Sequence, residues 1–372
     1  MKGKDRVEFI ASLKALLDIE GIGTAKLLSL FTKFDSFESI LYASPSSLCK
    51  VEHINSTLAN RIIKAKNELN KFVEQTEKEF EELDKINADI LTLWDQDFPT
   101  NLKRIYSPPL LLYYCGSLEL LNTDCLAVVG TRMPSAYGKL VCEKFSKELV
   151  FKEITIVSGL ARGIDSMAHS TVLSNKGKTI AVIGSGIDVI YPPENKKLFK
   201  GICETGLVLS EYPLGTRPDP QNFPKRNRII SGLSLGTLVI ETRITGGALQ
   251  TARYALDHGR EVFAIPGNIT SPQSEGTNFL IQRGEAKPVT KAEDILEELN
   301  LLNNANILIK KQVFDLNIFE QKIFDNLSDI PIHIDSLSNN TGFSTSDCLI
   351  NLLSLEFKGY VKQLPGKMFV KD

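Results

Sequence analysis

A short basic stretch near the middle of the chain has side chains suited to binding an anion. Residues 210–234 read SEYPLGTRPDPQNFPKRNRIISGLS, a Pro/Gly-rich loop that leads through Phe223, Lys225, Arg226, Asn227 and Arg228 into an apolar run. A helix N-terminus offers free backbone N–H groups and partial positive charge, so cations at such a junction predict a phosphate site. Phe223 adds a face on which a base could stack. The structural alternative is a buried Arg/Asn network that pins the loop to a sheet.

Glycine-rich loops, two of them with an arginine, follow other apolar runs. They contain Gly130, Arg132 and Ser135, then Gly159, Arg162 and Gly163, then Gly184-Ser185-Gly186, and finally Gly246. Glycine permits close backbone approach or positive φ, and guanidinium groups bind phosphates through a planar fork. Because the carboxyl ends of parallel strands meet at one edge of a sheet, the loops predict a single anion-binding rim.

Other chemistries fit the sequence less well. Gly184-Ser185-Gly186 begins a dinucleotide fingerprint, but Val189 occupies the place of its third glycine. The Walker pattern and the G-x-S-x-G elbow are absent, and the cysteines and histidines are scattered without metal-ligand spacing. Asp165, Asp188, Glu211 and Glu241 could form a carboxylate pair, but each also suits a helix cap or an arginine partner. We therefore expect no catalytic residue, no metal and no cofactor.

Alternating apolar runs and helical patterns position these loops. Strands of the main sheet are predicted at 126–129, 154–157, 179–183, 207–209, 237–240, 261–265 and 287–289. Helices are predicted between them at 137–151, 164–174, 195–202, 227–233, 248–258 and 277–283. Two added strands are predicted before the main sheet, at 90–94 and 110–115. Such alternation is typical of a parallel sheet covered on both faces, with ligands at the carboxyl ends of its strands. The predicted fold is α/β, an extended Rossmann-like, doubly wound, mainly parallel sheet.

Helical segments flank the sheet. Apolar residues at helical spacing predict helices across 7–70, where Gly21-Ile22-Gly23 is typical of a helix-hairpin-helix, a module that contacts DNA phosphates or docks proteins. A second hairpin at 51–55 would lack both glycines. A helical tail at 293–302, helices at 314–327, 333–339 and 345–357 and a hairpin at 364–367 predict a winged helix. Since 345–357 contains no cation, we favour protein docking or dimer support there over major-groove reading. The predicted domains are 1–80, 81–300 and 301–372.

Composition indicates a globular protein with a basic middle. The chain is 42% hydrophobic and 24% charged, with no apolar run as long as a membrane span and a start too polar for a signal peptide, so we expect a cytoplasmic location. Residues 125–290 hold 20 Lys and Arg against 14 Asp and Glu, a net charge of +6. Because the whole chain has a net charge of −2, the segments before and after this stretch together carry −8. A basic middle is the pattern of a polyanion site, or of a diffuse solvated surface.

The ordered motifs VVGTRMPSAYG, SGLARGIDSMAH, VIGSGIDVIYPPEN, SEYP, FPKRNRIISGLS, TGGALQTARYAL and GREVFAIPGN, spread over 91–289, resemble the DNA processing protein A (DprA/Smf) family. The resemblance implies a homodimer without enzymatic activity that binds single-stranded DNA with little sequence preference and loads a RecA-type recombinase during natural transformation. It implies DNA contacts at Arg132, Ser135, Gly159, Arg162, Phe223, Arg226, Asn227 and Arg228. To these the loops add Gly130, Gly163, Lys225 and Gly246. Thr131 stands where the family often has Ser, and Pro220 where some members have Lys.

An enzyme of related fold is the alternative. The lysine-decarboxylase-like phosphoribohydrolases carry a P-G-G-x-G-T-x-x-E loop whose glutamate performs chemistry. The comparable place in this chain reads Thr245-Gly246-Gly247-Ala248-Leu249-Gln250-Thr251, without the Gly-Thr pair or the glutamate. Release of a base from a nucleoside monophosphate would favour this alternative.

Overall fold

The computed structural model describes residues 3–301, 316–327, 332–358, 360–364 and 367–371. The chain divides into two compact units, Met1–Asn303 and Asn304–Asp372. The larger unit contains a group of helices followed by a nine-stranded sheet, and the smaller contains a three-stranded sheet with helices. The boundary predicted at residue 80 falls inside a helix of the larger unit, and the division into three domains stays a prediction.

Short capped helices begin the larger unit. They are α1 (Lys4–Leu17), α2 (Thr24–Phe34), α3 (Phe37–Leu41), α4 (Pro45–Leu48), α5 (Ser56–Lys66) and α6 (Leu69–Lys85). The side chains of Ser36, Ser44 and Asn55 accept backbone N–H groups at the starts of α3, α4 and α5, which satisfies donors that a helix leaves free. Between α1 and α2, Gly21 has a φ of 93°, a value that favours glycine in a tight turn. The predicted helical character of this region is confirmed.

The sheet has the strand order β1-β2-β6-β5-β4-β3-β7-β8-β9. Its strands are β1 (Ala88–Thr92), β2 (Leu111–Gly116), β3 (Cys125–Val129), β4 (Thr155–Ser158), β5 (Thr179–Ile183), β6 (Leu207–Ser210), β7 (Gly236–Val239), β8 (Glu261–Ala264) and β9 (Lys287–Pro288). β2 pairs antiparallel with β1 and β6, and the other pairs are parallel. The predicted α/β fold with two added strands is confirmed. The strand order reverses between β3 and β7, where ligands bind in such sheets.

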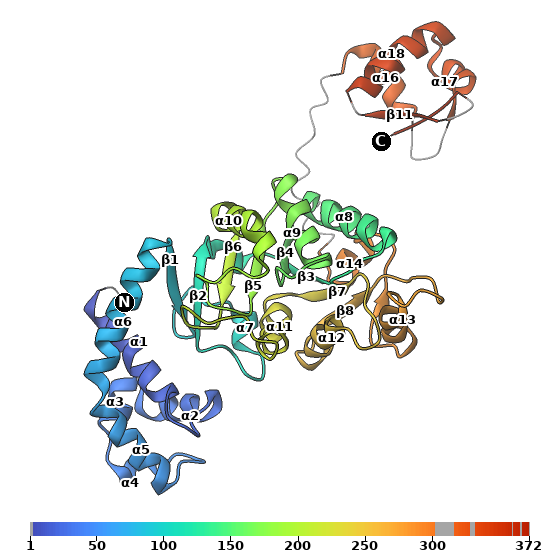
Figure 1. The fold of residues 1–372 in the computed structure, drawn as a ribbon. Coiled ribbons are helices and arrows are strands. Elements are labelled where there is room, and N and C mark those ends of the chain that lie inside the picture. The colour runs from blue at the N-terminus through green and yellow to red at the C-terminus, as the bar shows by residue number, and fades with distance from the viewer. Residues whose placement is uncertain (1–2, 302–315, 328–331, 359, 365–366, 372) are drawn as a thin grey trace. The chain divides into compact units, whose positions relative to one another are not determined.

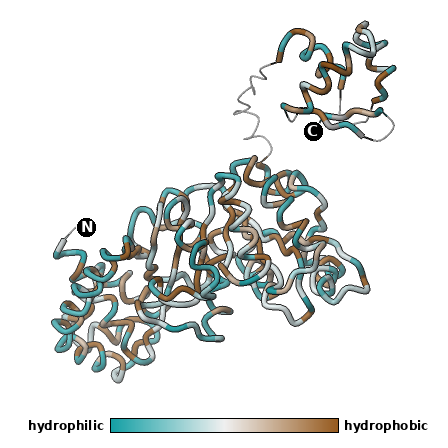
Figure 2. Tube along the Cα trace, turned by 45° about the horizontal axis from the view of Figure 1, so that its top comes forward, coloured by the Kyte–Doolittle hydropathy of each residue, from teal (hydrophilic) through white to brown (hydrophobic). Residues whose placement is uncertain are grey.

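Helices cover both faces of the sheet (Figure 1). One face carries α8 (Ala136–Phe151), α9 (Ile164–Ser174), α10 (Lys196–Thr205) and α14 (Ala292–Glu298). The other face carries α7 (Thr100–Lys103), α11 (Asn222–Leu233), α12 (Gly247–Asp257) and α13 (Glu275–Gln282). Two 3-10 helices, Leu118–Asn122 and Pro193–Asn195, lie in the connections between these elements. Along β3, Cys125, Ala127 and Val129 belong to the core on the α11–α12 side, whereas Leu126 and Val128 belong to the core on the α8–α9 side. Figure 2 shows brown, hydrophobic residues along the central strands. Burial on both faces explains why these strands read as continuous apolar runs.

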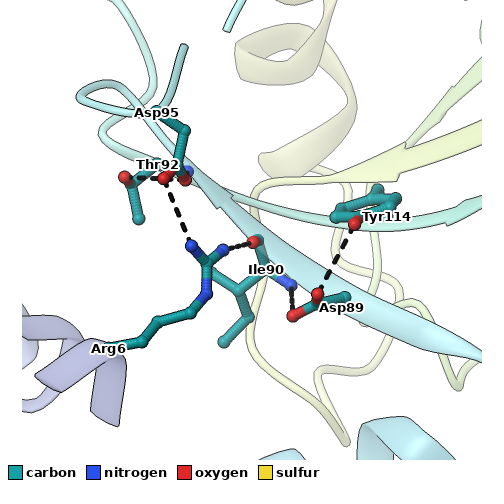
Figure 3. A network of polar contacts seen from close by, with 6 residues as sticks. All are labelled: Arg6, Asp89, Ile90, Thr92, Asp95 and Tyr114. Carbon is teal, nitrogen blue, oxygen red and sulfur yellow. Dashed lines mark hydrogen bonds and ion pairs between the residues drawn. The ribbon is translucent and has the colours of Figure 1, made fainter. Parts of the chain in front are cut away.

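Polar contacts join the N-terminal helices to the antiparallel edge of the sheet. Arg6 of α1 donates hydrogen bonds to the Ile90 carbonyl in β1 and to Asp95, whose carboxylate lies 3.2 Å away (Figure 3). The Asp95 carboxylate also accepts the backbone N–H of Thr92 at 2.7 Å. Because a half-buried arginine bonds both a carbonyl and a carboxylate here, α1 is held against β1 in one orientation.

An aromatic cluster continues that junction. Trp94, the only tryptophan of the chain, lies 4.8 Å and 4.7 Å from the ring centres of Phe31 and Phe37 and 5.9 Å from that of Phe9. The buried residues around it form one core cluster that extends from α1 to β6. The N-terminal helices and this half of the sheet therefore share a single core.

α11 begins five residues earlier than the sequence predicts, at Asn222 instead of 227. Pro224 lies in its first turn, where a helix needs no N–H donor from proline. Lys225, Arg226, Asn227 and Arg228 consequently lie on a helix, where successive side chains point about 100° apart. The prediction that they stand together at a loop-to-helix junction is wrong, because the helix turns them in different directions.

The smaller unit is a winged helix, as predicted. It contains α16 (Ile318–Asp325), α17 (Ile334–Thr341), α18 (Thr345–Phe357), β10 (Ile332–His333), β11 (Val361–Leu364) and β12 (Met368–Lys371), with the strand order β10-β12-β11. Residues 302, 314–315 and 365–366 of the predicted elements lie outside the described residues. The buried Glu320 side chain accepts hydrogen bonds from Ser354 at 2.6 Å and Lys358 at 2.8 Å, which ties α16 to α18. Among the described residues, no helix has the length and apolarity needed to cross a membrane.

Candidate nucleic-acid interface

A cavity lies at the edge of the sheet where the strand order reverses. Its volume is about 730 Å³, and the loops after the neighbouring strands β3 and β7 form opposite walls. Gly130, Thr131 and Arg132 come from the first loop, and Thr242 to Gly247 contribute to the second. The first turns of α11 supply Phe223, Arg226 and Asn227. The structure thus brings together the predicted loops after β3 and β7 and the predicted segment of α11.

Arg132 and Phe223 lie at the mouth of the cavity. The exposed Arg132 guanidinium is 5.6 Å from the centre of the Phe223 ring, and the centre of the Tyr191 ring is 5.7 Å from that of Phe223. A smaller hollow next to the cavity is lined by the same three side chains together with Gly159 and Arg162. An arginine over an aromatic face leaves N–H groups free for a phosphate, and the partly exposed rings offer stacking surfaces. Tyr191 was missed by the sequence analysis.

Arg226 lies inside the protein instead of lining the surface. Its side chain is 4% exposed and donates hydrogen bonds to the carbonyl oxygens of Gly159, at 2.7 Å, and of Val182. Burial lowers the pKa of Arg226 to about 10, so the group stays charged at neutral pH. A Cβ on Gly159 would lie 2.6 Å from the guanidinium, so glycine is needed for this approach. Arg226 matches the structural alternative, a buried network that pins α11 to the ends of β4 and β5.

Two further groups complete this buried network. Asp165 accepts the Gly159 N–H at 3.2 Å, and burial raises the pKa of its carboxyl, an effect that the charge of Arg226 opposes. His169 faces the Thr179 hydroxyl at 2.7 Å, and Thr179 in turn donates to the Ile156 carbonyl. Burial lowers the pKa of His169 to about 3, so this histidine is neutral and donates from Nδ1. These buried side chains hold the loop after β4 in place from the interior of the protein.

Arg228, Asn227 and Lys225 point away from Arg226 around α11. Arg228 donates to Glu211 at 2.6 Å and is half-buried, so its charge is already balanced. Asn227 lines the cavity, and Lys225 is exposed outside it. Of the four polar residues predicted to act as one cluster, Asn227 and the largely buried Arg226 line the cavity, and Lys225 is an exposed cation outside it.

The loop after β3 is held by a buried carboxylate. Glu241 accepts the backbone N–H of Ser135 at 2.9 Å and its hydroxyl at 2.5 Å, while the Ser135 hydroxyl accepts the Gly138 N–H at the start of α8. Gly163 has a φ of 79°, and a Cβ there would lie 2.3 Å from the Thr131 carbonyl oxygen, so this loop packs directly on the loop after β4. Ser135 and Gly163 therefore shape the rim, and Gly130 forms part of the cavity wall.

The remaining predicted residues lie on either side of the cavity. Arg162 is exposed and paired with Glu194 in the 3-10 helix Pro193–Asn195. Gly246 precedes α12 on the opposite wall, beside the exposed Arg243. Among the described residues, no ion pair engages Arg132, Lys225 or Arg243, so the rim carries three uncompensated positive charges. Arg243 was missed, although an arginine in a Thr/Gly-rich loop after a strand resembles the other signals that were used.

Comparison with known proteins gives consistent matches along the chain. The model of the DNA recombination-mediator protein A family matches residues 89–300, that of the DprA winged helix domain residues 314–367, and that of the SAM-like helix-hairpin-helix tandem residues 13–68. Protein Smf of Synechocystis is 35% identical over 94% of this chain and 96% of its own length. DNA processing protein DprA of Streptococcus pneumoniae is 48% identical over 56% of this chain and 73% of its own length.

Two solved structures are similar in fold. The X-ray structure of DNA processing protein A from Streptococcus pneumoniae has a TM-score of 0.67 and 37% identity, over 80% of this chain and 99% of that chain. DNA processing protein A from Helicobacter pylori, whose structure is described as showing a single-stranded DNA binding mode, has a TM-score of 0.52 and 30% identity, over 57% of this chain and 96% of that chain.

Proposed function

Because this chain belongs to the DNA recombination-mediator protein A family, we propose that it binds single-stranded DNA without sequence preference at the cavity between β3 and β7. The observation that carries the proposal is the rim of that cavity, where the exposed Arg132 lies 5.6 Å from the centre of the Phe223 ring and the exposed Arg243 lines the opposite wall. These two arginines and Lys225, exposed on α11 outside the cavity, have no carboxylate partner among the described residues. The Helicobacter pylori relative with a described single-stranded DNA binding mode supports it.

The chemistry of the rim suits a strand more than a duplex. Cations spaced around an aromatic face bind phosphates and stack bases, and both contacts tolerate any sequence. Each phosphate that is neutralised contributes about −0.7 to the slope of log affinity against log salt, so three cations give a slope of about −2 per subunit.

We further propose that the bound strand passes to a RecA-type recombinase and that two copies of the chain act together. The family's description as a recombination mediator supports the first statement. A homodimer would join two rims and strengthen the binding of long strands through effective concentration. The winged helix takes the role of a docking module in this proposal, because α18 carries no Lys or Arg.

Catalysis is not part of the proposal. Glu241 is 1% exposed and accepts hydrogen bonds from Ser135, and Asp165, which lines the cavity, is 7% exposed and accepts the Gly159 N–H, so both carboxylates are engaged within the protein. A nucleoside monophosphate incubated with the protein should therefore remain intact by chromatography.

The DNA site is tested by fluorescence anisotropy of a labelled oligothymidine and of its duplex over a salt series. We expect tight binding of the single strand, and weaker binding with a salt slope nearer zero by about 0.7 for each of Arg132→Ala and Lys225→Ala. Lys200→Ala, on the exposed surface of α10 on the other face of the sheet, removes the same charge as a control. The proposal fails if the rim variants bind like the control, or if the unaltered chain binds no single strand.

The partner proposals need separate measurements. Sedimentation at several concentrations should give twice the mass of one chain. A recombinase on strands coated with single-strand-binding protein should assemble faster when the chain is added, and more slowly with Arg132→Ala. Equal assembly rates with and without the chain would refute the loading step while leaving DNA binding in place.

A further inference from the structure

The cavity continues beyond the loop that begins α12. A second hollow of about 410 Å³ lies on the other side of this loop, and Thr245, Gly246, Gly247 and Gln250 line both hollows. The second hollow extends along α12 to Arg253 and Tyr254. Because the two hollows share these four residues, they adjoin each other at the start of α12, and we call the two together the groove.

The segment between the two hollows exposes its backbone, because it consists of two glycines. Gly247 is exposed, and nothing lies within 4 Å of the position that a Cβ would take there. Gly246 precedes it as the residue that caps the helix, without a side chain over the first turn. The first N–H groups of an α-helix have no partner within the helix, so this passage presents hydrogen-bond donors where a phosphate could approach.

The far hollow repeats the chemistry of the first. Arg253 is exposed and has no ion pair among the described residues, and Arg243 stands at the near end of the groove in the same condition. The half-buried Tyr254 ring stacks on the His258 ring, 6.2 Å between centres and 18° between planes, which fixes its orientation. Ile244 adds an apolar surface that is 46% exposed. Among the described residues, Asp257 is the one acidic side chain that lines this hollow.

We propose that this groove extends the strand path: a single-stranded nucleic acid held in the cavity crosses Gly246 and Gly247, places a phosphate at Arg253 and stacks a base on Tyr254. The inference rests on the proposed function of the cavity. The wall shared with the cavity and the two exposed arginines, Arg243 at the near end and Arg253 at the far end, favour a polyanion as occupant. The alternation of arginine with aromatic side chains favours a strand whose bases are unpaired.

The length of the DNA strand distinguishes binding in the cavity from binding along the second hollow. Oligothymidines from about four to about sixteen nucleotides are titrated against the unaltered chain, Arg253→Gln, Tyr254→Leu, Arg132→Ala and the control Lys200→Gln. For long strands we expect Arg253→Gln to reduce the salt slope by about 0.7 and Tyr254→Leu to weaken binding about 5- to 150-fold. For the shortest strands, which fill only the cavity, both variants should bind like the control. Arg132→Ala should weaken binding at every length.

The outcomes are distinguishable from failure of the proposed function. If Arg132→Ala weakens binding while Arg253→Gln and Tyr254→Leu match Lys200→Gln at every length, the cavity binds DNA and the groove does not. If the two groove variants instead change the sedimenting mass and leave the length dependence intact, the groove is a protein interface and the inference is overturned. If no variant and no length matters, the cavity itself is not the DNA site.

Discussion

Replacement of Arg226 by methionine should destabilise the larger unit through the buried network beneath the rim. The change removes the donors to the Gly159 and Val182 carbonyl oxygens, both inside the protein, and it removes the positive charge that opposes the raised pKa of Asp165. Each buried carbonyl left without a donor costs about 1–3 kcal/mol, so the two carbonyls together cost about 2–6 kcal/mol. We expect a loss of about 2–6 kcal/mol, reduced only slightly by the apolar contacts of methionine.

Urea unfolding followed by Trp94 fluorescence measures this loss. Trp94 is the only tryptophan and lies in the core cluster that runs from α1 to β6, so its emission reports on the larger unit. Arg228→Met provides the matched control. Its guanidinium is partly solvated and paired with Glu211, so its loss should cost about 1 kcal/mol.

The pH dependence adds a second readout with a definite sign. Burial raises the folded-state pKa of Asp165 above that of the unfolded chain, and removal of Arg226 raises it further. Between the two pKa values the folded state binds more protons, so stability falls as the pH rises through that range. The deficit of Arg226→Met should therefore be larger at about pH 8 than at about pH 5. Unfolding at the same urea concentration as the unaltered chain, or a deficit that is constant with pH, would refute the role assigned to Arg226.

Three further predictions follow from single contacts. Glu241→Gln should lower the free energy of unfolding, measured by Trp94 fluorescence, by about 1–3 kcal/mol. It should also weaken single-strand binding without changing the salt slope, because it disorders the loop after β3 but removes no rim cation, and a reduced slope would contradict this. Arg6→Met should increase hydrogen exchange in β1, since the bonds from α1 to Ile90 and Asp95 are lost, and unchanged exchange would show that the core alone holds α1 in place. In the winged helix, the hydrogen bonds from Lys358 and Ser354 lower the pKa of Glu320 from 4.5 to about 2. Protection of α16–α18 from hydrogen exchange should therefore be lost as the pH falls from 4.5 to about 2, and Glu320→Gln should abolish this pH-dependent loss.

The fold could be predicted because its signals are local. β-Branched and apolar runs bounded by glycine gave the strands to within two residues, and their alternation with helical patterns gave the parallel sheet. The strand order was not available from the pattern, because it depends on which strands pair across the crossovers. The position of the cavity between β3 and β7 therefore became visible only in the structure.

The roles of the α11 residues could be predicted only in part. Pro224 was interpreted as a loop residue, although a first helical turn also accepts proline. That choice placed Lys225 to Arg228 side by side, whereas the helix sends Arg226 inward and Lys225 outward. Composition identifies a basic segment, but the rotation of each side chain about a helix depends on where that helix begins. Tyr191 lies in the motif VIGSGIDVIYPPEN and Arg243 in the loop that ends at Gly246 and Gly247, but neither side chain was included among the candidate residues.

The core shared by the N-terminal helices and the sheet has a consequence for synthesis on the ribosome. The helices end at Lys85, but the cluster in which they take part includes Tyr113 in β2 and Val208 in β6. At about 5–20 residues per second, translation of the stretch between Lys85 and Val208 lasts on the order of ten seconds. During that interval the nascent helices expose the apolar surface that will later meet the sheet. These helices are therefore made well before the strands that complete their core, and until then their apolar surface is open to chaperones.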